Sequence, residues 1–424
     1  MSFTESSCDW PGFSWMPCKT PIQVAVNVVA KKISLIPRYN WDYGLKDFAR
    51  GISSIAQRAE TNTDILQSVF GRKPIPTAAG RTSLYAILKA LDLPNGAQVG
   101  VPLYCCPVVF DAINRAGLRP RFIDIDPDTY TISPQDLADK KKRLAAAVVV
   151  HMFGHPADMD AISDVVGGDF PVIEDCAQSL FSCYKGKMTG FFGNAAFFSF
   201  RSAKYISAGE GSLILANDST LADEINEVVN SLSTPSPLEE IFHCSSTLAK
   251  SVLNKRPWYG LLGYPIGQML DNRVNLTAKS GFKYAAARKS DLAIIAERIR
   301  EFSNIAEKQR GNALYLLGET NSEKTILPFE KEGCRSNYYL FAVRFNSNSH
   351  RDSASRFLVT NGVDNSKYLD EVISIASADY DYQGDCPNAE ICSDTVLVIP
   401  HYYTLEKPRL DYIVDRLNAS LEIL

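Results

Sequence analysis

The sequence predicts an α/β protein in which a large domain with a mostly parallel sheet precedes a smaller α+β domain at the C-terminus. Its 424 residues are too many for one simple hydrophobic core, which favours two or more domains. From residue 78 onward, short apolar stretches of strand length alternate with helical patterns. Strands that are apolar on both faces and separated by helices are typical of a parallel sheet covered on both sides.

An N-terminal arm is expected over residues 1–75. This part is irregular and rich in Trp, Pro and Ser, so we expect it to pack on another part of the protein. Its longest apolar stretch, 22–36, is interrupted by polar and charged residues. It is too short and too polar to span a bilayer, and we expect no membrane partner. An amphipathic surface segment is the alternative interpretation of this stretch.

The large domain is expected over residues 76–265. A helix at 81–91 has apolar residues at helical spacing, and a second helix at 110–116 ends at Gly117. Residues 231–268 show no clear period, and we interpret them as an insertion or a connection. The expected strands of this domain are 121–125, 144–150, 172–173, 195–200 and 212–216.

The connecting helix and the small domain are expected over residues 266–424. The stretch 278–302 has a long helical pattern and could form a spine between the domains. Strands and helices then alternate over a shorter length. The expected elements are a strand at 338–345, a helix at 351–360, a strand at 395–399 and a helix at 407–421.

Composition excludes several classes of function. The formal net charge is -4, without a large basic or acidic block, so no nucleic-acid partner is expected from bulk electrostatics. The ten cysteines form no CxxC pair and have no histidine at zinc-finger spacing, so no metal site is expected. No secretory signal is recognised, and we interpret the cysteines as reduced thiols of a cytoplasmic protein.

Three places follow strand ends or open helices, where active sites of open α/β sheets lie. The first is 79–83, which opens the helix predicted at 81–91. Gly80, Arg81 and Thr82 would leave backbone N–H groups free at the positive end of the helix dipole, a suitable site for a phosphate. The alternative is an ordinary turn with a hydroxyl residue in the first helical turn.

The second place is 174–178, directly after a strand. Asp175 could ligate a metal, act as a base or pair with a buried cation, and beside a pyridine nitrogen it would keep that nitrogen protonated. The alternative is that Asp175 caps the following turn while Gln178 satisfies backbone groups.

The third place is 199–211, where Lys204 follows a strand inside a loop closed by two glycines. A buried lysine at a strand end can lose its proton and attack a carbonyl. The alternative is a solvated surface lysine, the most common fate of this residue type.

Together, the stretch 80–218 resembles the DegT/StrS family of pyridoxal-phosphate (PLP) dependent sugar aminotransferases. Each matching motif is short, but their order and spacing agree, which is more specific than any one of them. A weaker match runs over 393–417. The motifs are 80–84, 101–104, 122–130, 151–160, 174–178, 199–204 and 209–211.

The resemblance implies a PLP-dependent transferase of fold type I. Lys204 would hold the cofactor as a Schiff base and later move a proton, and Asp175 would contact the pyridine nitrogen. Gln178 would lie near the ring or its oxygen substituent, while Ser199 and the turn at 81–82 would hold the phosphate. The implied site residues are therefore Gly80, Arg81, Thr82, Cys106, Asp175, Gln178, Ser199 and Lys204.

This chain departs from the family pattern at three places. The family usually has an aromatic residue over the cofactor ring where this chain has Cys106, which leaves Tyr104, His151 or Phe153 as candidates for that contact. The alternative is that the cofactor ring is held less well. Residues 361–368 occupy the approximate place of a Tyr-x-Pro-x-His stretch, and 273–275 only partly match an Asn-x-Arg motif. These departures concern the substrate side and the subunit interface.

The resemblance implies transfer of an amino group from an amino acid, with glutamate as the expected donor, to a keto group of a nucleotide-linked sugar. A homodimer is expected. One alternative is a PLP sugar dehydratase or lyase, but the relatives that dehydrate sugars replace the lysine by histidine, and Lys204 argues against it. Another alternative is a catalytically silent relative with a binding or regulatory role.

Overall fold

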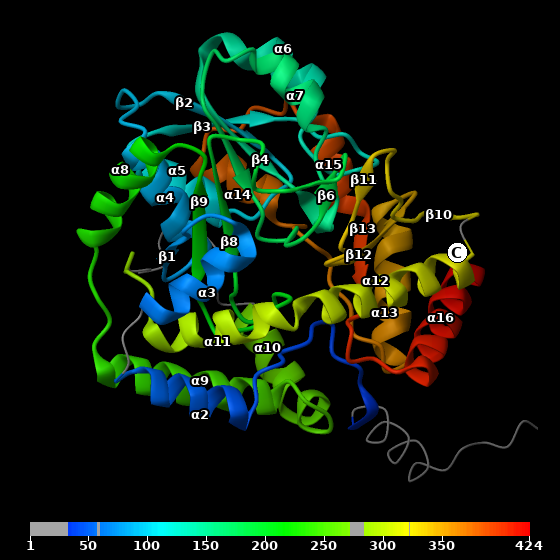
Figure 1. Cartoon of the computed structure of the whole chain (residues 1–424). Helices are drawn as coiled ribbons and strands as arrows, with labels where there is room; N and C mark the ends of the chain where they lie inside the picture. Colours follow the sequence, from blue (N-terminus) through cyan, green and yellow to red (C-terminus); the bar gives the residue numbers. More distant parts are fainter. Residues whose placement is uncertain (1–32, 57–59, 272–283, 322) are drawn as a thin grey trace, which may run out of the picture.

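The computed structural model describes residues 33–56, 60–271, 284–321 and 323–424 (Figure 1). Most of the predicted amphipathic stretch 22–36 and the motif at 273–275 therefore lie outside the described residues. Within the predicted arm, two helices are described, α2 (Leu45–Ser54) and α3 (Glu60–Phe70). Both pack against α11 (Lys289–Arg300) from the other half of the chain.

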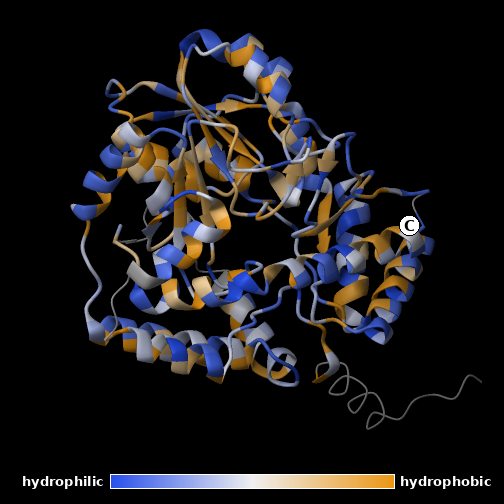
Figure 2. Cartoon of the chain, viewed as in Figure 1, coloured by the Kyte–Doolittle hydropathy of each residue, from blue (hydrophilic) through white to orange (hydrophobic). Residues whose placement is uncertain are grey.

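A seven-stranded sheet forms the large domain, in the order β1-β9-β8-β5-β4-β2-β3. The pairs β2–β3, β2–β4, β4–β5 and β5–β8 are parallel, whereas β9 is antiparallel to both of its neighbours. The central strands are hydrophobic along their length (Figure 2). The strands are β1 (Ile75–Thr77), β2 (Gln98–Pro102), β3 (Arg119–Ile123), β4 (Leu144–Val150), β5 (Val172–Asp175), β8 (Ala195–Ser199) and β9 (Ser212–Ala216).

Helices cover both faces of this sheet, which explains why its strands are apolar throughout. On one face α4 (Gly80–Ala90) packs against α5 (Val108–Arg115) and α8 (Ser219–Asn230). On the other face α6 (Pro134–Lys140) and α7 (Met159–Val166) close a separate hydrophobic cluster. The remaining elements here are the 3-10 turns at Lys141–Arg143 and Met152–Gly154.

The small domain is built on an antiparallel three-stranded sheet with its own hydrophobic cluster. Its strands are β10 (Thr325–Ile326), β12 (Phe341–Phe345) and β13 (Val396–Ile399). Its helices are α12 (Phe302–Glu319), α13 (Asn348–Thr360), α14 (Val372–Asp379), α15 (Pro387–Thr395) and α16 (Lys407–Glu422). We propose domain boundaries near residues 76 and 266.

A short third sheet joins the two parts of the chain. Its strands are β6 (Cys183–Tyr184), β7 (Lys187–Met188) and β11 (Cys334–Arg335), of which β11 comes from the C-terminal half. The helix α11 is followed directly by α12, and together they run from the large sheet to the small domain (Figure 1).

The connecting region differs from its prediction. Among its described residues, the predicted helix 278–302 is helical at Lys289–Arg300 and again at Phe302, where α12 begins, whereas the backbone at 285–286 pairs with 77–78 and 233. The segment 231–268, which shows no clear period in the sequence and was interpreted as an insertion or a connection, contains α9 (Pro237–Leu253), the π-helix Tyr259–Gly263 and the first part of α10 (Tyr264–Asp271). Large apolar side chains on the exposed side of α9 obscure its helical period.

The end of β5 is anchored from one side by Glu174. Successive residues of a strand point to opposite faces, so Glu174 faces away from Asp175. Its buried carboxylate accepts N–H groups from Gly190, Phe192 and Gly193 at 2.6–2.7 Å. It also accepts the Nε2–H of His151 at 3.0 Å, because the Nδ1 atom of that ring accepts the Ala157 N–H.

These hydrogen bonds explain why the Glu174 carboxylate is negatively charged although it is buried. Burial by itself raises the pKa of Glu174, but the bonds from His151 and the backbone hold it below its ordinary value. His151, Glu174 and Cys176 lie close enough together to hold a metal ion. Both nitrogen atoms of His151 are already engaged, and burial raises the pKa of the Cys176 thiol, so we assign the trio a structural role.

Replacing Glu174 by alanine is expected to lower the free energy of unfolding by about 3–5 kcal/mol, because buried donors lose their acceptor. Urea unfolding of the variant against the wild type measures this loss. Glu227→Ala, on the exposed side of α8, is the matched control and should change the free energy little. A loss below about 1 kcal/mol for Glu174→Ala would contradict the anchoring role.

Candidate active site

A cavity of about 320 Å³ lies where the parallel strands end. The loop after β2 contributes Cys106, β5 ends in Asp175, and β8 ends in Ser199 ahead of Lys204. Because the carboxyl ends of parallel strands meet at one edge, residues far apart in sequence converge here. The predicted site residues that line the cavity are Gly80, Arg81, Cys106, Asp175, Gln178, Ser199 and Lys204. Thr82 is buried nearby but does not line it.

Lys204 lies in the loop after β8, half-buried, with its Nζ 4.7 Å from the centre of the Tyr339 ring. The loop is held from the small domain, because the Tyr339 hydroxyl donates to the Ala203 carbonyl at 2.9 Å. Burial lowers the pKa of Lys204 to about 8, although the charge of Asp175 opposes this shift. A substantial fraction of the amine is therefore neutral near physiological pH, as a nucleophile requires.

Asp175 is buried at the end of β5, with one carboxylate oxygen accepting the Ala177 N–H at 2.9 Å. No other hydrogen bond to this carboxylate is found among the described residues. Burial raises the pKa of Asp175, and the Lys204 amine partly offsets that rise. A cation placed in the cavity would favour the ionised carboxylate and would itself be stabilised in its charged form.

The start of α4 provides an anion site. Its N-cap, Ala79, offers no side-chain acceptor, so the first N–H groups of the helix remain available. The Thr82 hydroxyl is buried without a partner in the described part of the chain. Arg81 and Arg201 both line the cavity, and burial and the charge of Arg201 lower the pKa of Arg81. These groups together favour a bound anion.

Tyr104, His151 and Phe153 were expected to contact the face of the cofactor ring, but none of the three lines the cavity. The hydroxyl of Tyr104 donates to the Tyr368 carbonyl at 2.9 Å, and the His151 ring is bonded to Glu174. Phe153 packs edge-on against Tyr104 and Tyr368, with ring centres 6.2 Å and 5.2 Å away. These side chains are already engaged in the surrounding core, so the expectation for them is wrong.

Besides Phe197 of β8, three tyrosines line the cavity: Tyr39, Tyr339 and Tyr368. Sequence reasoning missed them, since they come from the arm and the small domain and follow no recognised motif. The only available signal was the departure from the family pattern at 361–368, which ends in Tyr368.

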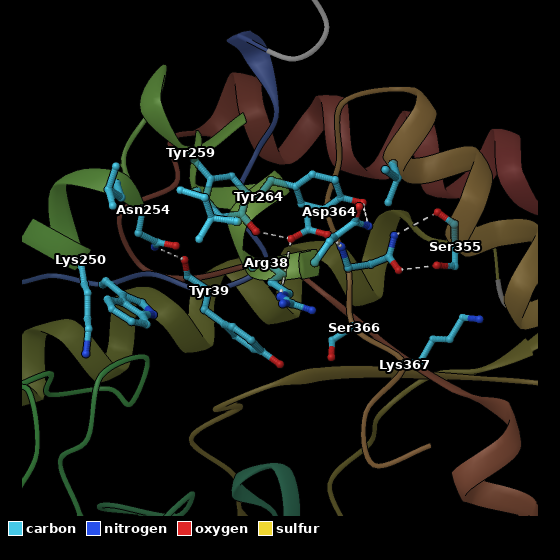
Figure 3. A pocket seen from close by; sticks show the side chains of 18 of the residues that line it. Arg38, Tyr39, Lys250, Asn254, Tyr259, Tyr264, Ser355, Asp364, Ser366 and Lys367 are labelled. Carbon is cyan, nitrogen blue, oxygen red and sulfur yellow. Dashed lines mark hydrogen bonds and ion pairs between the residues drawn. The ribbon is translucent and has the colours of Figure 1, made fainter. Parts of the chain in front are cut away.

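A second cavity of about 680 Å³ shares Tyr39 with the first (Figure 3). Arg38, Lys250 and Lys367 contribute positive charges to its lining, and Trp41 and Tyr264 contribute aromatic rings. At its floor, buried Asp364 accepts a hydrogen bond from Tyr259 and lies 3.7 Å from the Arg38 Nε atom (Figure 3). This cavity therefore combines cationic and aromatic groups beside the first.

The donor set of the first cavity fits PLP. The Lys204 amine suits an aldehyde, buried Asp175 suits a protonated pyridine nitrogen, and the start of α4 suits a phosphate. The Thr82 hydroxyl, buried in the first turn of this helix, has no hydrogen-bond partner among the described residues.

Comparisons with known proteins agree with this assignment. Residues 68–256 match the model of the DegT/DnrJ/EryC1/StrS aminotransferase family. GDP-perosamine synthase of Escherichia coli O157:H7 is 38% identical over 146 residues, which are 34% of this chain and 40% of that relative.

Two solved structures share the fold. They are the putative sugar aminotransferase Spr1654 of Streptococcus pneumoniae in its PLP form and the GDP-4-keto-6-deoxy-D-mannose-3-dehydratase of E. coli with hydrated PLP. Their TM-scores are 0.73 and 0.70, with sequence identities of 15% and 19%. The likeness covers 92% and 90% of this chain and 100% of each structure. The predicted PLP-dependent transferase fold of type I is confirmed.

The rate at which the apo protein reacts with PLP is expected to rise with pH and to level off above a midpoint near 8. Only the neutral amine attacks the aldehyde, and Lys204 is neutral above its pKa. Asp175→Asn removes the negative charge that favours the protonated amine, so it should move the midpoint to lower pH. The absorbance change on mixing measures this rate. A rate that keeps rising to pH 10 would contradict the assignment, since that is the behaviour of a solvated lysine.

Proposed function

Because residues 68–256 match the model of the DegT/DnrJ/EryC1/StrS aminotransferase family, we propose that this chain is a PLP-dependent sugar aminotransferase of that family. The amino group would come from an amino acid, with glutamate the expected donor, and pass to a keto group of a nucleotide-linked sugar. The observation that carries this proposal is one cavity holding the half-buried Lys204 amine, the buried Asp175 carboxylate and the start of α4.

Each residue has a distinct task in this reaction. PLP, when bound, supplies an electron sink for the carbon that exchanges its amino group. Lys204 holds the cofactor and, once released, moves a proton between two carbon atoms as a neutral amine. Asp175 keeps the pyridine nitrogen protonated, because an ion pair favours both charged forms. The start of α4, with Thr82 and Ser199, orients the phosphate.

The second cavity supports a nucleotide-linked acceptor. A keto-sugar reaching Lys204 could extend past Tyr39 into this cavity, since that residue lines both. Lys250 could pair with phosphate oxygens, and Trp41 could stack on a base, whereas Lys367 is already paired with Asp352 at 2.8 Å. The similarity to the E. coli GDP-perosamine synthase also supports a nucleotide-linked acceptor, although the alignment spans 40% of the length of that relative.

The alternative of a sugar dehydratase is less well supported. One solved structure with this fold is a dehydratase, so the fold itself allows both reactions. The relatives that dehydrate sugars replace the lysine by histidine, whereas Lys204 is present here with a lowered pKa. A catalytically inactive relative would not require the lowered pKa of Lys204 or the buried carboxylate of Asp175.

We propose a homodimer joined through α9 and α10. Phe242 is 76% exposed, Trp258 is 48% exposed and Met269 is 61% exposed, and such a concentration of large apolar side chains is typical of an interface. Light scattering of the purified protein should give twice the mass of one chain, and Phe242→Asp should shift the population toward single chains. A wild-type protein that is monomeric at micromolar concentration would contradict the proposal.

The proposed reaction is tested with PLP-loaded protein, glutamate and a panel of keto-sugars. Glutamate alone should convert bound PLP to its pyridoxamine form, and nucleotide-linked keto-sugars should be aminated faster than the free sugars. Lys204→Ala should lower turnover by about 10²–10⁴-fold, the size of a lost proton-transfer group. Lys308→Ala, an exposed lysine of α12, is the control. No pyridoxamine formation, or full activity in Lys204→Ala, would refute the reaction.

A further inference from the structure

The side chain of Gln178 has no hydrogen left for a ligand. Its carbonyl oxygen accepts the Phe153 N–H at 3.0 Å. Its nitrogen donates to the Tyr368 hydroxyl at 3.0 Å and to the sulfur of Met152 at 3.4 Å. A primary amide carries two N–H hydrogens, so both are engaged. The role expected for Gln178, a contact with the oxygen substituent of the cofactor ring, therefore requires another donor.

Tyr368 is the donor next to it. Its hydroxyl oxygen accepts the bond from Gln178, and no acceptor for its own hydrogen is found in the part of the chain that the structure describes. The residue is half-buried and lines the same cavity as Lys204 and Asp175. A hydroxyl that receives a hydrogen bond is also polarised toward donating one.

Three contacts fix the position of this phenol. Its backbone carbonyl accepts the Tyr104 hydroxyl at 2.9 Å, and its ring packs edge-on against Phe153 with centres 5.2 Å apart. The bond from Gln178 is the third contact. Burial raises the pKa of Tyr368 well above its ordinary value, so the hydroxyl keeps its hydrogen at physiological pH.

We propose that Tyr368 donates a hydrogen bond to the oxygen substituent of the bound pyridoxal ring, and that Gln178 is a positioning residue that holds Tyr368 in place. This inference rests on the proposed function, since it requires PLP in the cavity. It also assigns a role to residues 361–368, which depart from the family pattern. Tyr368 at the end of this stretch belongs to the small domain and would complete a site formed mainly by the large domain.

The inference has a spectroscopic consequence. A donor to the ring oxygen stabilises the anionic form of that oxygen, which lowers the pH at which the bound cofactor loses its proton. Removing the donor should raise the midpoint of the absorbance change of the PLP-loaded protein by about one pH unit. Cofactor affinity should fall about tenfold, the usual effect of one hydrogen bond to a charged group.

Four variants of the full chain test this inference: Tyr368→Phe, Gln178→Leu, the double variant, and Tyr382→Phe as control. Tyr368→Phe keeps the ring that packs on Phe153 and removes only the hydroxyl. The Tyr382 hydroxyl binds Glu390 and does not line the cavity. The PLP dissociation constant and the absorbance midpoint are measured for each.

Both single variants should show the weaker affinity and the higher midpoint, and the double variant should show little more than Tyr368→Phe alone, because Gln178 acts through Tyr368. The control should match the wild type. If the wild-type protein binds PLP and Tyr368→Phe has the same absorbance midpoint as the wild type, this inference is wrong. The proposed function would not be affected by that result. Additive effects in the double variant would overturn it too, since Gln178 would then contact the ring directly. Wild-type protein that takes up no PLP would refute the proposed function and this inference with it.

Discussion

The proposed chemistry of this protein depends on an amine and a carboxylate that line one cavity. Burial disfavours the charged form of each group, so it lowers the pKa of Lys204 and raises that of Asp175. The charge of each group partly opposes the shift of the other. A fraction of the amine is thereby neutral at physiological pH, and the Asp175 carboxylate can pair with a cation that enters the cavity.

The sheet makes this arrangement possible by dividing the tasks of adjacent residues. At the end of β5, Glu174 points to one face and is bonded by backbone N–H groups and His151, while Asp175 points to the cavity. Glu174 therefore holds in place the strand end that carries Asp175. Tyrosines from the arm and the small domain then cover the cavity, so distant parts of the chain complete it.

Much of the site could be predicted from the sequence. Asp175 and Ser199 end buried strands and Lys204 follows one, and parallel strands bring their carboxyl ends to one edge. Tyr39, Tyr339 and Tyr368 could not be predicted in this way, because tertiary packing alone brings them to the cavity. The strands β1 and β2 were also missed, since β1 contains Pro76, and β2 contains Gly100 and ends at Pro102, residue types that favour turns over strands.

The central claim is that Lys204 is the residue to which the cofactor is joined. Borohydride reduction of PLP-loaded protein, followed by proteolysis and mass spectrometry, tests it most directly, because reduction makes the bond between amine and cofactor permanent. The account predicts one modified peptide, the one that contains Lys204. Modification spread over several exposed lysines, with the Lys204 peptide recovered unmodified, would contradict it.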